Sequence, residues 1–263
     1  ALRWAVDRAE RRGGEIVALL AWTFFDGGYG AQGKDVQIAF SQDDARRILD
    51  RAVDAVAPNA EVTRQTVEEP APEALAAAAG PDDLIVVGAR GLGGIKGLLL
   101  GSVSQGVLEL APCPVAIVHG DDALAGGGEI VVGIDGSERS MLALRWAAAE
   151  AAAAHSTLHI VHAWQVPSYA QMAVPQMITA LEEGATELVT KAAEDPSLDG
   201  LTLRCDVACG VPTQALLDHA EGASMLVVAS RGLGAVKRFL LGSTSRQVSL
   251  HATTTVVVVP GRE

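Results

Sequence analysis

Residues 88–104 read GARGLGGIKGLLLGSVS and residues 229–245 read ASRGLGAVKRFLLGSTS, so one glycine-rich sequence occurs twice at an offset of 141 residues. Each copy follows a short run of β-branched and other apolar residues that is typical of a buried strand. A loop with few side chains after such a strand lets backbone approach a ligand closely, and the ligand most often held in this way is phosphate. The repeat therefore predicts two sites for a phosphate-containing ligand.

A second match shows how the repeat divides the chain. Residues 1–22 and 143–164 both begin ALRWA and end in AW, at an offset of 142. Because the two offsets differ by a single residue, one small length difference between the copies explains both matches. A period of about 140 residues indicates a duplicated domain rather than a solenoid repeat. We therefore expect one domain over 1–120, a linker over 121–128 and a second domain over 129–263.

The composition excludes several classes of function. The formal net charge of the 263-residue chain is −12, which disfavours nucleic acid as a partner, because binding to many phosphates requires a basic surface. No apolar run approaches the roughly 20 residues that a membrane-spanning helix needs. The three cysteines, Cys113, Cys205 and Cys209, cannot form a disulfide framework. These observations favour a cytoplasmic protein that binds neither nucleic acid nor membrane.

The second copy predicts strands that alternate with helices. Its strands are continuously apolar, as in IVVGI, MLVVA and TVVVV, which is typical of a parallel sheet covered on both faces. Ser137 stands in the position of a helix N-cap. The predicted strands cover 129–135, 157–163, 201–208, 225–229 and 254–259, and the predicted helices include 138–154, 213–221 and 244–251. The fold class is α/β, with two tandem, doubly wound, Rossmann-like parallel-sheet domains.

The first copy follows the same order with one omission. Ala1 aligns with Ala143, so nothing in the chain as given corresponds to the strand and turn at 129–142. A doubly wound sheet should not survive the loss of an interior strand. We therefore expect about 14 further residues ahead of Ala1 in the natural protein.

The spacing of the glycines favours an anion site. In the first copy Gly88, Gly91, Gly101 and Ser102 follow the pattern G-x2-G-x9-G-S. The loop leaves the carboxyl end of a strand and ends at a helix N-terminus, where free N–H groups and the helix dipole favour an anion. Gly88 and Gly91 would let backbone approach phosphate, and Gly101 would allow a tight entry into the helix. The Ser102 hydroxyl would both cap that helix and contact a phosphate oxygen.

Several alternatives stay open at these loops. The equivalent positions of the second copy are Ala229, Gly232, Gly242 and Ser243. The methyl group of Ala229, in place of the first glycine, would either be tolerated or crowd the ligand. Arg90 and Arg231 would either neutralise phosphate charge or remain solvated loop cations. A plain tight turn is the alternative for the glycines themselves.

These loops, the strand-turn GIDGS at 133–137 and the strand ending HAW resemble the universal stress protein family, over nearly the whole chain as two tandem copies. Nucleotide-binding members of that family carry the motif G-x2-G-x9-G-(S/T). The resemblance implies that Asp135 contacts the adenosine part, although a local capping role is the alternative. It implies backbone contacts to adenine from Ala163 and, in the first copy, from Ala21. It further implies a binding set in the loops and the GIDGS turn: Gly88, Arg90, Gly91, Gly101, Ser102, Val103, Gly133, Ser137, Ala229, Arg231, Gly232, Gly242, Ser243 and Thr244.

The resemblance implies a regulator that binds ATP in one or both halves, with magnesium beside the phosphates. No general base or water-positioning residue is identifiable, so any hydrolysis should be slow. In this family the apolar final strands, here 115–118 and 256–259, pair across domains. We therefore expect an intramolecular pseudo-dimer, and further association of two chains as a homodimer. The alternatives are cyclic AMP as the ligand, an ATPase or nucleotidyl-transfer enzyme, and a nucleotide-free interaction scaffold.

Overall fold

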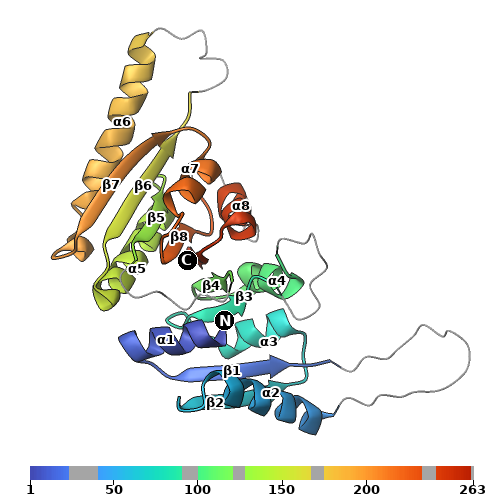
Figure 1. The fold of residues 1–263 in the computed structure, drawn as a ribbon. Helices are drawn as coiled ribbons and strands as arrows, with labels where there is room; N and C mark the ends of the chain where they lie inside the picture. The colour runs from blue at the N-terminus through green and yellow to red at the C-terminus, as the bar shows by residue number, and fades with distance from the viewer. Residues whose placement is uncertain (24–40, 91–99, 121–127, 167–174, 233–240, 262–263) are drawn as a thin grey trace, which may run out of the picture.

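A computed structural model describes residues 1–23, 41–90, 100–120, 128–166, 175–232 and 241–261. These residues form a two-stranded sheet and a seven-stranded sheet with helices packed on them (Figure 1). Within the described ranges, no helix combines the length and the hydropathy needed to cross a membrane. Most of the expected linker, residues 121–127, lies outside the described residues.

The second half of the chain forms a complete doubly wound unit. Its strands are all parallel and lie in the order β7-β6-β5-β8-β9. The elements are β5 (Ile130–Ile134), α5 (Glu138–Ala154), β6 (Leu158–Trp164), α6 (Pro175–Ala193), η2 (Pro196–Leu198), β7 (Leu203–Cys209), α7 (Pro212–His219), β8 (Met225–Ala229), α8 (Ser243–His251) and β9 (Thr255–Val259). The bounds predicted from the sequence lie within two residues of these.

Alternate residues of these strands face two different helix layers. Val132 lies in the core cluster that includes residues of α5 and α6, whereas its neighbour Val131 lies in the cluster that includes residues of α7 and α8. This burial on both faces explains why the strands are continuously apolar. Helix α5 lies close to the sheet because small side chains recur one turn apart, with Ala143, Ala147 and Ala151 all completely buried.

The first half repeats this order but divides its strands between the two sheets. Its elements are α1 (Leu2–Arg12), β1 (Ile16–Ala21), α2 (Gln42–Val56), β2 (Val62–Val67), α3 (Ala71–Ala78), β3 (Ile85–Gly88), α4 (Ser102–Leu110) and β4 (Val115–Val118). Strands β1 and β2 form the two-stranded sheet, while β3 and β4 belong to the seven-stranded sheet. In the second half β5 lies between β6 and β8. Across the described part of the first half, no strand takes the equivalent place between β1 and β3.

The two halves meet where β4 pairs with β9 in antiparallel orientation. Residue Ala116 pairs with Val257, and these positions are equivalent in the repeat because they differ by 141. An approximate two-fold axis therefore passes through this pair. The predicted pairing of the two terminal strands as an intramolecular pseudo-dimer is confirmed.

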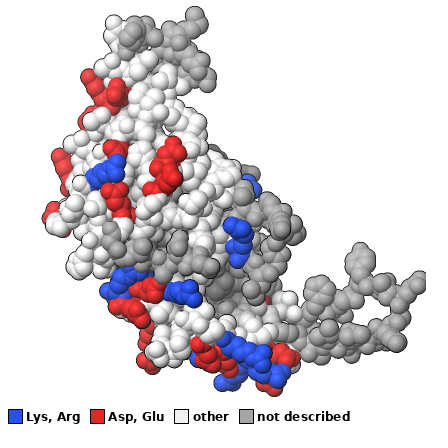
Figure 2. Space-filling view, viewed as in Figure 1, with Lys and Arg blue, Asp and Glu red and all other residues white. Residues whose placement is uncertain are grey.

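Charged side chains are spread over the visible face in Figure 2 without an extended basic area among the residues coloured there. Helix α6 carries exposed carboxylates, and charges of both signs lie over α1 and α2. The acidic side chains of α6 are Glu182, Glu183 and Glu187, and Glu194 follows directly after the helix. This distribution agrees with the formal net charge of −12.

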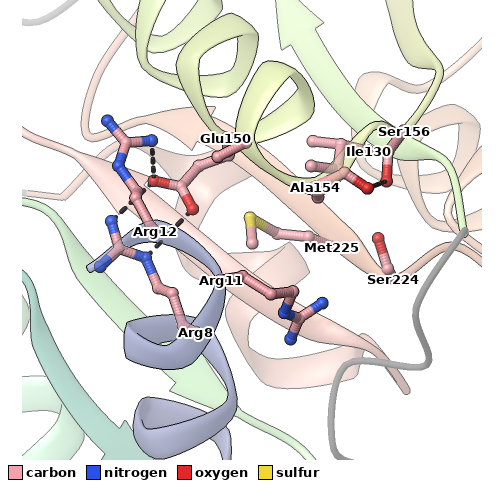
Figure 3. A pocket seen from close by; sticks show the side chains of 10 residues that line it. Arg8, Arg11, Arg12, Ile130, Glu150, Ala154, Ser156, Ser224 and Met225 are labelled. Atoms are coloured by element: carbon pink, nitrogen blue, oxygen red, sulfur yellow. Dashed lines mark hydrogen bonds and ion pairs between the residues drawn. The ribbon is translucent and has the colours of Figure 1, made fainter.

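Helices α1 and α5 pack together near the two-fold axis, and an ion-pair cluster joins them (Figure 3). Arg8 donates two hydrogen bonds to Glu150, of 3.0 and 2.7 Å, and Arg12 donates a third of 2.7 Å. The side chain of Glu150 is only 6% exposed. Arg8 and Glu150 are equivalent in the repeat at the offset of 142. The duplicated positions therefore carry opposite charges and contact each other.

Candidate functional site

The carboxyl ends of β5, β6 and β8 lie at one edge of the seven-stranded sheet, because these strands are adjacent and parallel. Asp135 follows β5 directly, Ala163 lies next to the last residue of β6, and Ala229 ends β8. These three predicted site residues, which are far apart in the sequence, therefore share one sheet edge. This edge is where ligands bind in open α/β sheets.

Gly232 brings the loop after β8 against the carboxylate that follows β5. A Cβ atom added to Gly232 would lie 2.2 Å from Asp135 Oδ2, which is shorter than any nonbonded contact. Only glycine can therefore occupy this position without moving Asp135 or the loop. The close approach gives a physical reason for the second glycine of the motif in this copy.

Asp135 also organises the turn into α5. Its Oδ1 atom accepts hydrogen bonds from the backbone N–H of Ser137 at 3.0 Å and from the Ser137 hydroxyl at 2.6 Å. The Ser137 hydroxyl in turn accepts a hydrogen bond from the Ser140 backbone N–H, which confirms Ser137 as the N-cap. The Asp135 carboxylate therefore stabilises the local turn through Oδ1 and also lies close to Gly232 through Oδ2.

The two helices that follow the glycine loops begin without a side-chain cap. Gly101 is the N-cap of α4 and Gly242 is the N-cap of α8, and among the described residues no side chain forms a capping hydrogen bond at either helix start. The prediction that Ser102 caps its helix is therefore wrong: Ser102 is the first residue of α4, one position too late to cap it. Uncapped first-turn N–H groups and the helix dipole favour an anion at both ends.

The backbone angles at the two N-cap positions do not require glycine. Gly101 has φ −73° and ψ 155°, and Gly242 has φ −61° and ψ 151°, which are extended conformations open to any residue. The tight feature is steric, since a Cβ atom on Gly242 would lie 3.3 Å from Arg231 Cα and from the Ser230 carbonyl oxygen. Glycine here keeps the helix start close to the strand end.

A matched pair of serines, which the sequence reasoning missed, fixes each helix to its strand. The Ser104 hydroxyl donates to the Gly88 carbonyl at 2.7 Å, and the Ser245 hydroxyl donates to the Ala229 carbonyl at 2.6 Å. Both serines are buried. Their identity at the repeat offset of 141 was the available signal. The same interaction therefore positions the helix N-terminus in both halves.

The remaining predicted residues have varied surroundings. A Cβ atom on Gly133 would lie 2.8 Å from Leu216, so helix packing accounts for this glycine. Val103 and Thr244 each follow the first residue of their helices, as the motif requires. Arg90 interacts electrostatically with His119, whose pKa is lowered first by burial and then by the positive charge of Arg90. Gly91 lies outside the described residues.

The first-half residues are divided between the two sheets. Ala21 ends β1 in the two-stranded sheet, while Gly88 ends β3 in the seven-stranded sheet. In the second half, β6 and β8 are both paired with β5, which holds their ends at one edge. The two halves of this chain therefore differ in how completely they assemble the predicted site.

A separate pocket lies at the opposite end of the second-half strands (Figure 3). It is lined by the arginines of α1, by α5 and by the starts of β5 and β8, with Ile130 and Met225 at those strand starts. Two of its arginines, Arg8 and Arg12, are held by Glu150. This pocket therefore belongs to the contact between the halves and is distinct from the carboxyl edge.

The fold and the repeated strand-loop-helix edge define a tandem protein of the doubly wound α/β class. The model of the Universal stress protein family matches residues 1–119 and 128–260, and the chain belongs to that family. A universal stress protein of Mycobacterium tuberculosis strain H37Rv is 33% identical over 181 residues, which cover 67% of this chain and 61% of the relative. One of Mycolicibacterium smegmatis is 35% identical over 182 residues, covering 68% of this chain and 62% of that protein.

The solved structures support the same fold. A universal stress protein of Archaeoglobus fulgidus superimposes with a TM-score of 0.62 at 23% identity, covering 98% of this chain and 92% of that one. The similarity extends over both halves of the chain. It therefore agrees with the tandem organisation read from the repeat.

Proposed function

We propose that the second half binds an adenine nucleotide, ATP, at the carboxyl edge of its sheet, and that the protein acts as a nucleotide-responsive regulator without fast catalysis. The observation that carries this proposal is the close approach of Gly232 to Asp135 beside the uncapped start of α8. The glycine provides backbone N–H groups without a side chain, and the helix start favours negative charge. A polyanionic ligand with a hydroxylated sugar suits this combination of amides and one carboxylate.

The residues divide into two groups in this proposal. Asp135 and the backbone of Ala163 would hold the nucleoside part, as the family resemblance implies. Gly232, Gly242 and Ser243 would hold the phosphates, with Arg231 and Thr244 beside them. Magnesium would accompany ATP and neutralise part of the phosphate charge. No proton transfer is assigned to these residues, so the site would bind and release nucleotide rather than turn it over rapidly.

Ser243 offers a test that separates binding from folding. The side chain is exposed at the first position of α8, so Ser243→Asp should preserve the helix, because a carboxylate there interacts favourably with the dipole. The same charge would repel a phosphate group, and we expect the Kd for ATP to rise by at least about tenfold. Ser243→Asn, whose amide has nearly the shape of the aspartate carboxylate without its charge, is the matched control and should weaken ATP binding much less than Ser243→Asp does.

Isothermal titration with ATP and magnesium, and separately with cyclic AMP, measures the effect. Unchanged ATP affinity in Ser243→Asp, with circular dichroism like that of the parent, would refute the assignment of the site. Ser102→Asp makes the same change in the first half and should leave the stoichiometry of this chain unchanged. If cyclic AMP binds more tightly than ATP, the assignment of the site stands and the proposed ligand changes to cyclic AMP.

A further inference from the structure

Three potential metal ligands gather on the face of the sheet that α7 covers, far from the predicted nucleotide edge. His159 lies on β6, Asp206 on β7, and His219 is the last residue of α7. One ligand atom from each lies within 4.8 Å of the other two. His159 Nε2 is 2.7 Å from Asp206 Oδ2, and His219 Nε2 is 3.9 Å from the same oxygen. The cluster is near the amino ends of the strands, since His159 is the second residue of β6.

The protonation of His219 follows from its other ring nitrogen. His219 Nδ1 lies 2.7 Å from the backbone carbonyl oxygen of Ala215. Because a carbonyl only accepts hydrogen bonds, Nδ1 carries the proton of the neutral ring. The Nε2 atom then presents its lone pair toward the Asp206 carboxylate. In that tautomer Nε2 is free to bind a metal ion beside the Asp206 carboxylate.

His159 has a carboxylate oxygen near each of its two ring nitrogens. Its side chain is completely buried between two carboxylates, with Nε2 at 2.7 Å from Asp206 and Nδ1 at 3.4 Å from Glu129 Oε2. Within the described residues, Nδ1 has no hydrogen-bond partner. A neutral imidazole has one proton, so whichever nitrogen carries it, the other directs a lone pair at a carboxylate.

We propose that His159 Nε2, Asp206 Oδ2 and His219 Nε2 bind a divalent transition-metal ion, Zn²⁺. A cation between these atoms would accept both imidazole lone pairs and the carboxylate oxygen. The His159 proton would then move to Nδ1 and point toward Glu129. Each histidine would have an oxygen acceptor on its second ring nitrogen, Glu129 in one case and the Ala215 carbonyl in the other, as is usual for metal-bound histidines.

The distances suit this ion after small side-chain movements. Ligand atoms about 2.0–2.2 Å from a tetrahedral Zn²⁺ lie about 3.3–3.6 Å from one another. The observed separations of 2.7 and 3.9 Å fall on either side of that range. The side chains of Asp206 and His219 are 36% and 24% exposed, so the ion can enter from solvent and a water molecule can fill the fourth position.

The local charge also favours a cation. Glu129 and Asp206 carry two negative charges, and Arg204 supplies one positive charge through contacts of 3.3 and 3.2 Å to these carboxylates. With neutral histidines the group therefore keeps a net charge of −1. Arg204 is 54% exposed, so it can leave Asp206 Oδ2 without losing contact with water. It should compete with the metal ion for this oxygen.

A zinc titration against a chromophoric chelator tests the site in the full chain. The background should be Cys205→Ser with Cys209→Ser, because both thiols are exposed and could bind zinc independently. We expect one zinc ion per chain, and we expect His219→Ala and Asp206→Asn each to weaken its binding by more than about 100-fold. His219 is partly exposed at a helix end, so its removal should leave the fold intact.

Two further variants distinguish a metal site from a structural network of hydrogen bonds. Glu129→Gln should weaken zinc by about tenfold, because it alters the acceptor for the His159 ring. Arg204→Met should tighten zinc by roughly two- to fivefold, because it removes a competing cation at a partly exposed carboxylate. If the cluster were only a structural network of hydrogen bonds, the protein would not bind zinc, and neither variant would change a zinc affinity.

His251→Ala is the matched histidine control, since His251 is exposed and contacts Gln247 outside the cluster. It should retain the zinc affinity of the background. Cobalt bound in place of zinc should show visible d–d absorption that disappears in His219→Ala. Failure of the background protein to bind zinc, or equal zinc binding in His219→Ala, Asp206→Asn and His251→Ala, would overturn the proposal.

Discussion

Replacing Arg8 and Arg12 together by methionine should leave the buried carboxylate of Glu150 without a partner at the contact between the halves. Methionine preserves much of the apolar stem of arginine, so the change chiefly removes charge and hydrogen bonds. Glu150 is 6% exposed, whereas Arg8 and Arg12 are 20% and 34% exposed. The carboxylate, rather than either guanidinium, is therefore the group that cannot return to water.

The expected magnitudes follow from this asymmetry. Arg8→Met removes two charge-assisted hydrogen bonds but leaves Glu150 paired, which should cost about 1.5 kcal/mol of unfolding free energy. Arg12→Met removes one bond from a more exposed donor and should cost about 1 kcal/mol. The double variant strands a buried charge and should cost about 4 kcal/mol, which exceeds the sum of the single changes.

Urea denaturation monitored by circular dichroism measures these free energies. Arg11→Met is the matched control, because Arg11 lies on the same helix and its Nε donates to the backbone oxygen of Asp7. Adding Glu150→Met to the double variant should recover most of the loss, since no buried charge then remains. A double variant within about 0.5 kcal/mol of Arg11→Met would refute the reasoning.

Three further predictions concern single groups. Ser137→Ala should lower the unfolding free energy by about 1 kcal/mol through loss of the α5 N-cap, while Ser137→Thr should restore most of it in the same urea assay. A thiol reagent should label Cys205 and Cys209 in the native protein and Cys113 only after unfolding, because burial raises the pKa of the Cys113 thiol to about 11; native labelling of all three would contradict this. Burial lowers the folded-state pKa of His159, so the unfolded chain takes up its proton first and stability should fall as pH drops below about 6.5; a urea midpoint that rises between about pH 6.5 and 5 would contradict this.

The sequence alone was sufficient for the architecture of the second half. Its buried strands are continuously apolar, and turn and capping residues such as Ser137 stand at the element boundaries, so local chemistry determines where each element begins and ends. The family resemblance also implied that the apolar final strands at 115–118 and 256–259 would pair across the halves. Their pairing buries two apolar edges that would otherwise remain exposed.

The glycine loops were only partly predictable. The motif indicated close backbone approach, but only the structure showed that the atom opposite Gly232 is Asp135 Oδ2. Ser102 was predicted as a cap, whereas the helix begins one residue earlier than that role requires. A sequence pattern locates the start of a helix only to within one or two residues, whereas the N-cap role depends on the identity of a single position. The cap of α4 could therefore not be predicted from the pattern.

Tertiary structure alone decided which distant side chains meet. His159 and Asp206 are separated by 47 residues and share a sheet face because of the parallel register of β6 and β7. His219 joins them because α7 runs back across that face. Arg8 and Glu150 likewise meet only because equivalent helices pack near a two-fold axis. Sequence spacing describes neighbours along a helix or strand, whereas contacts between elements depend on how the whole sheet and its helices pack.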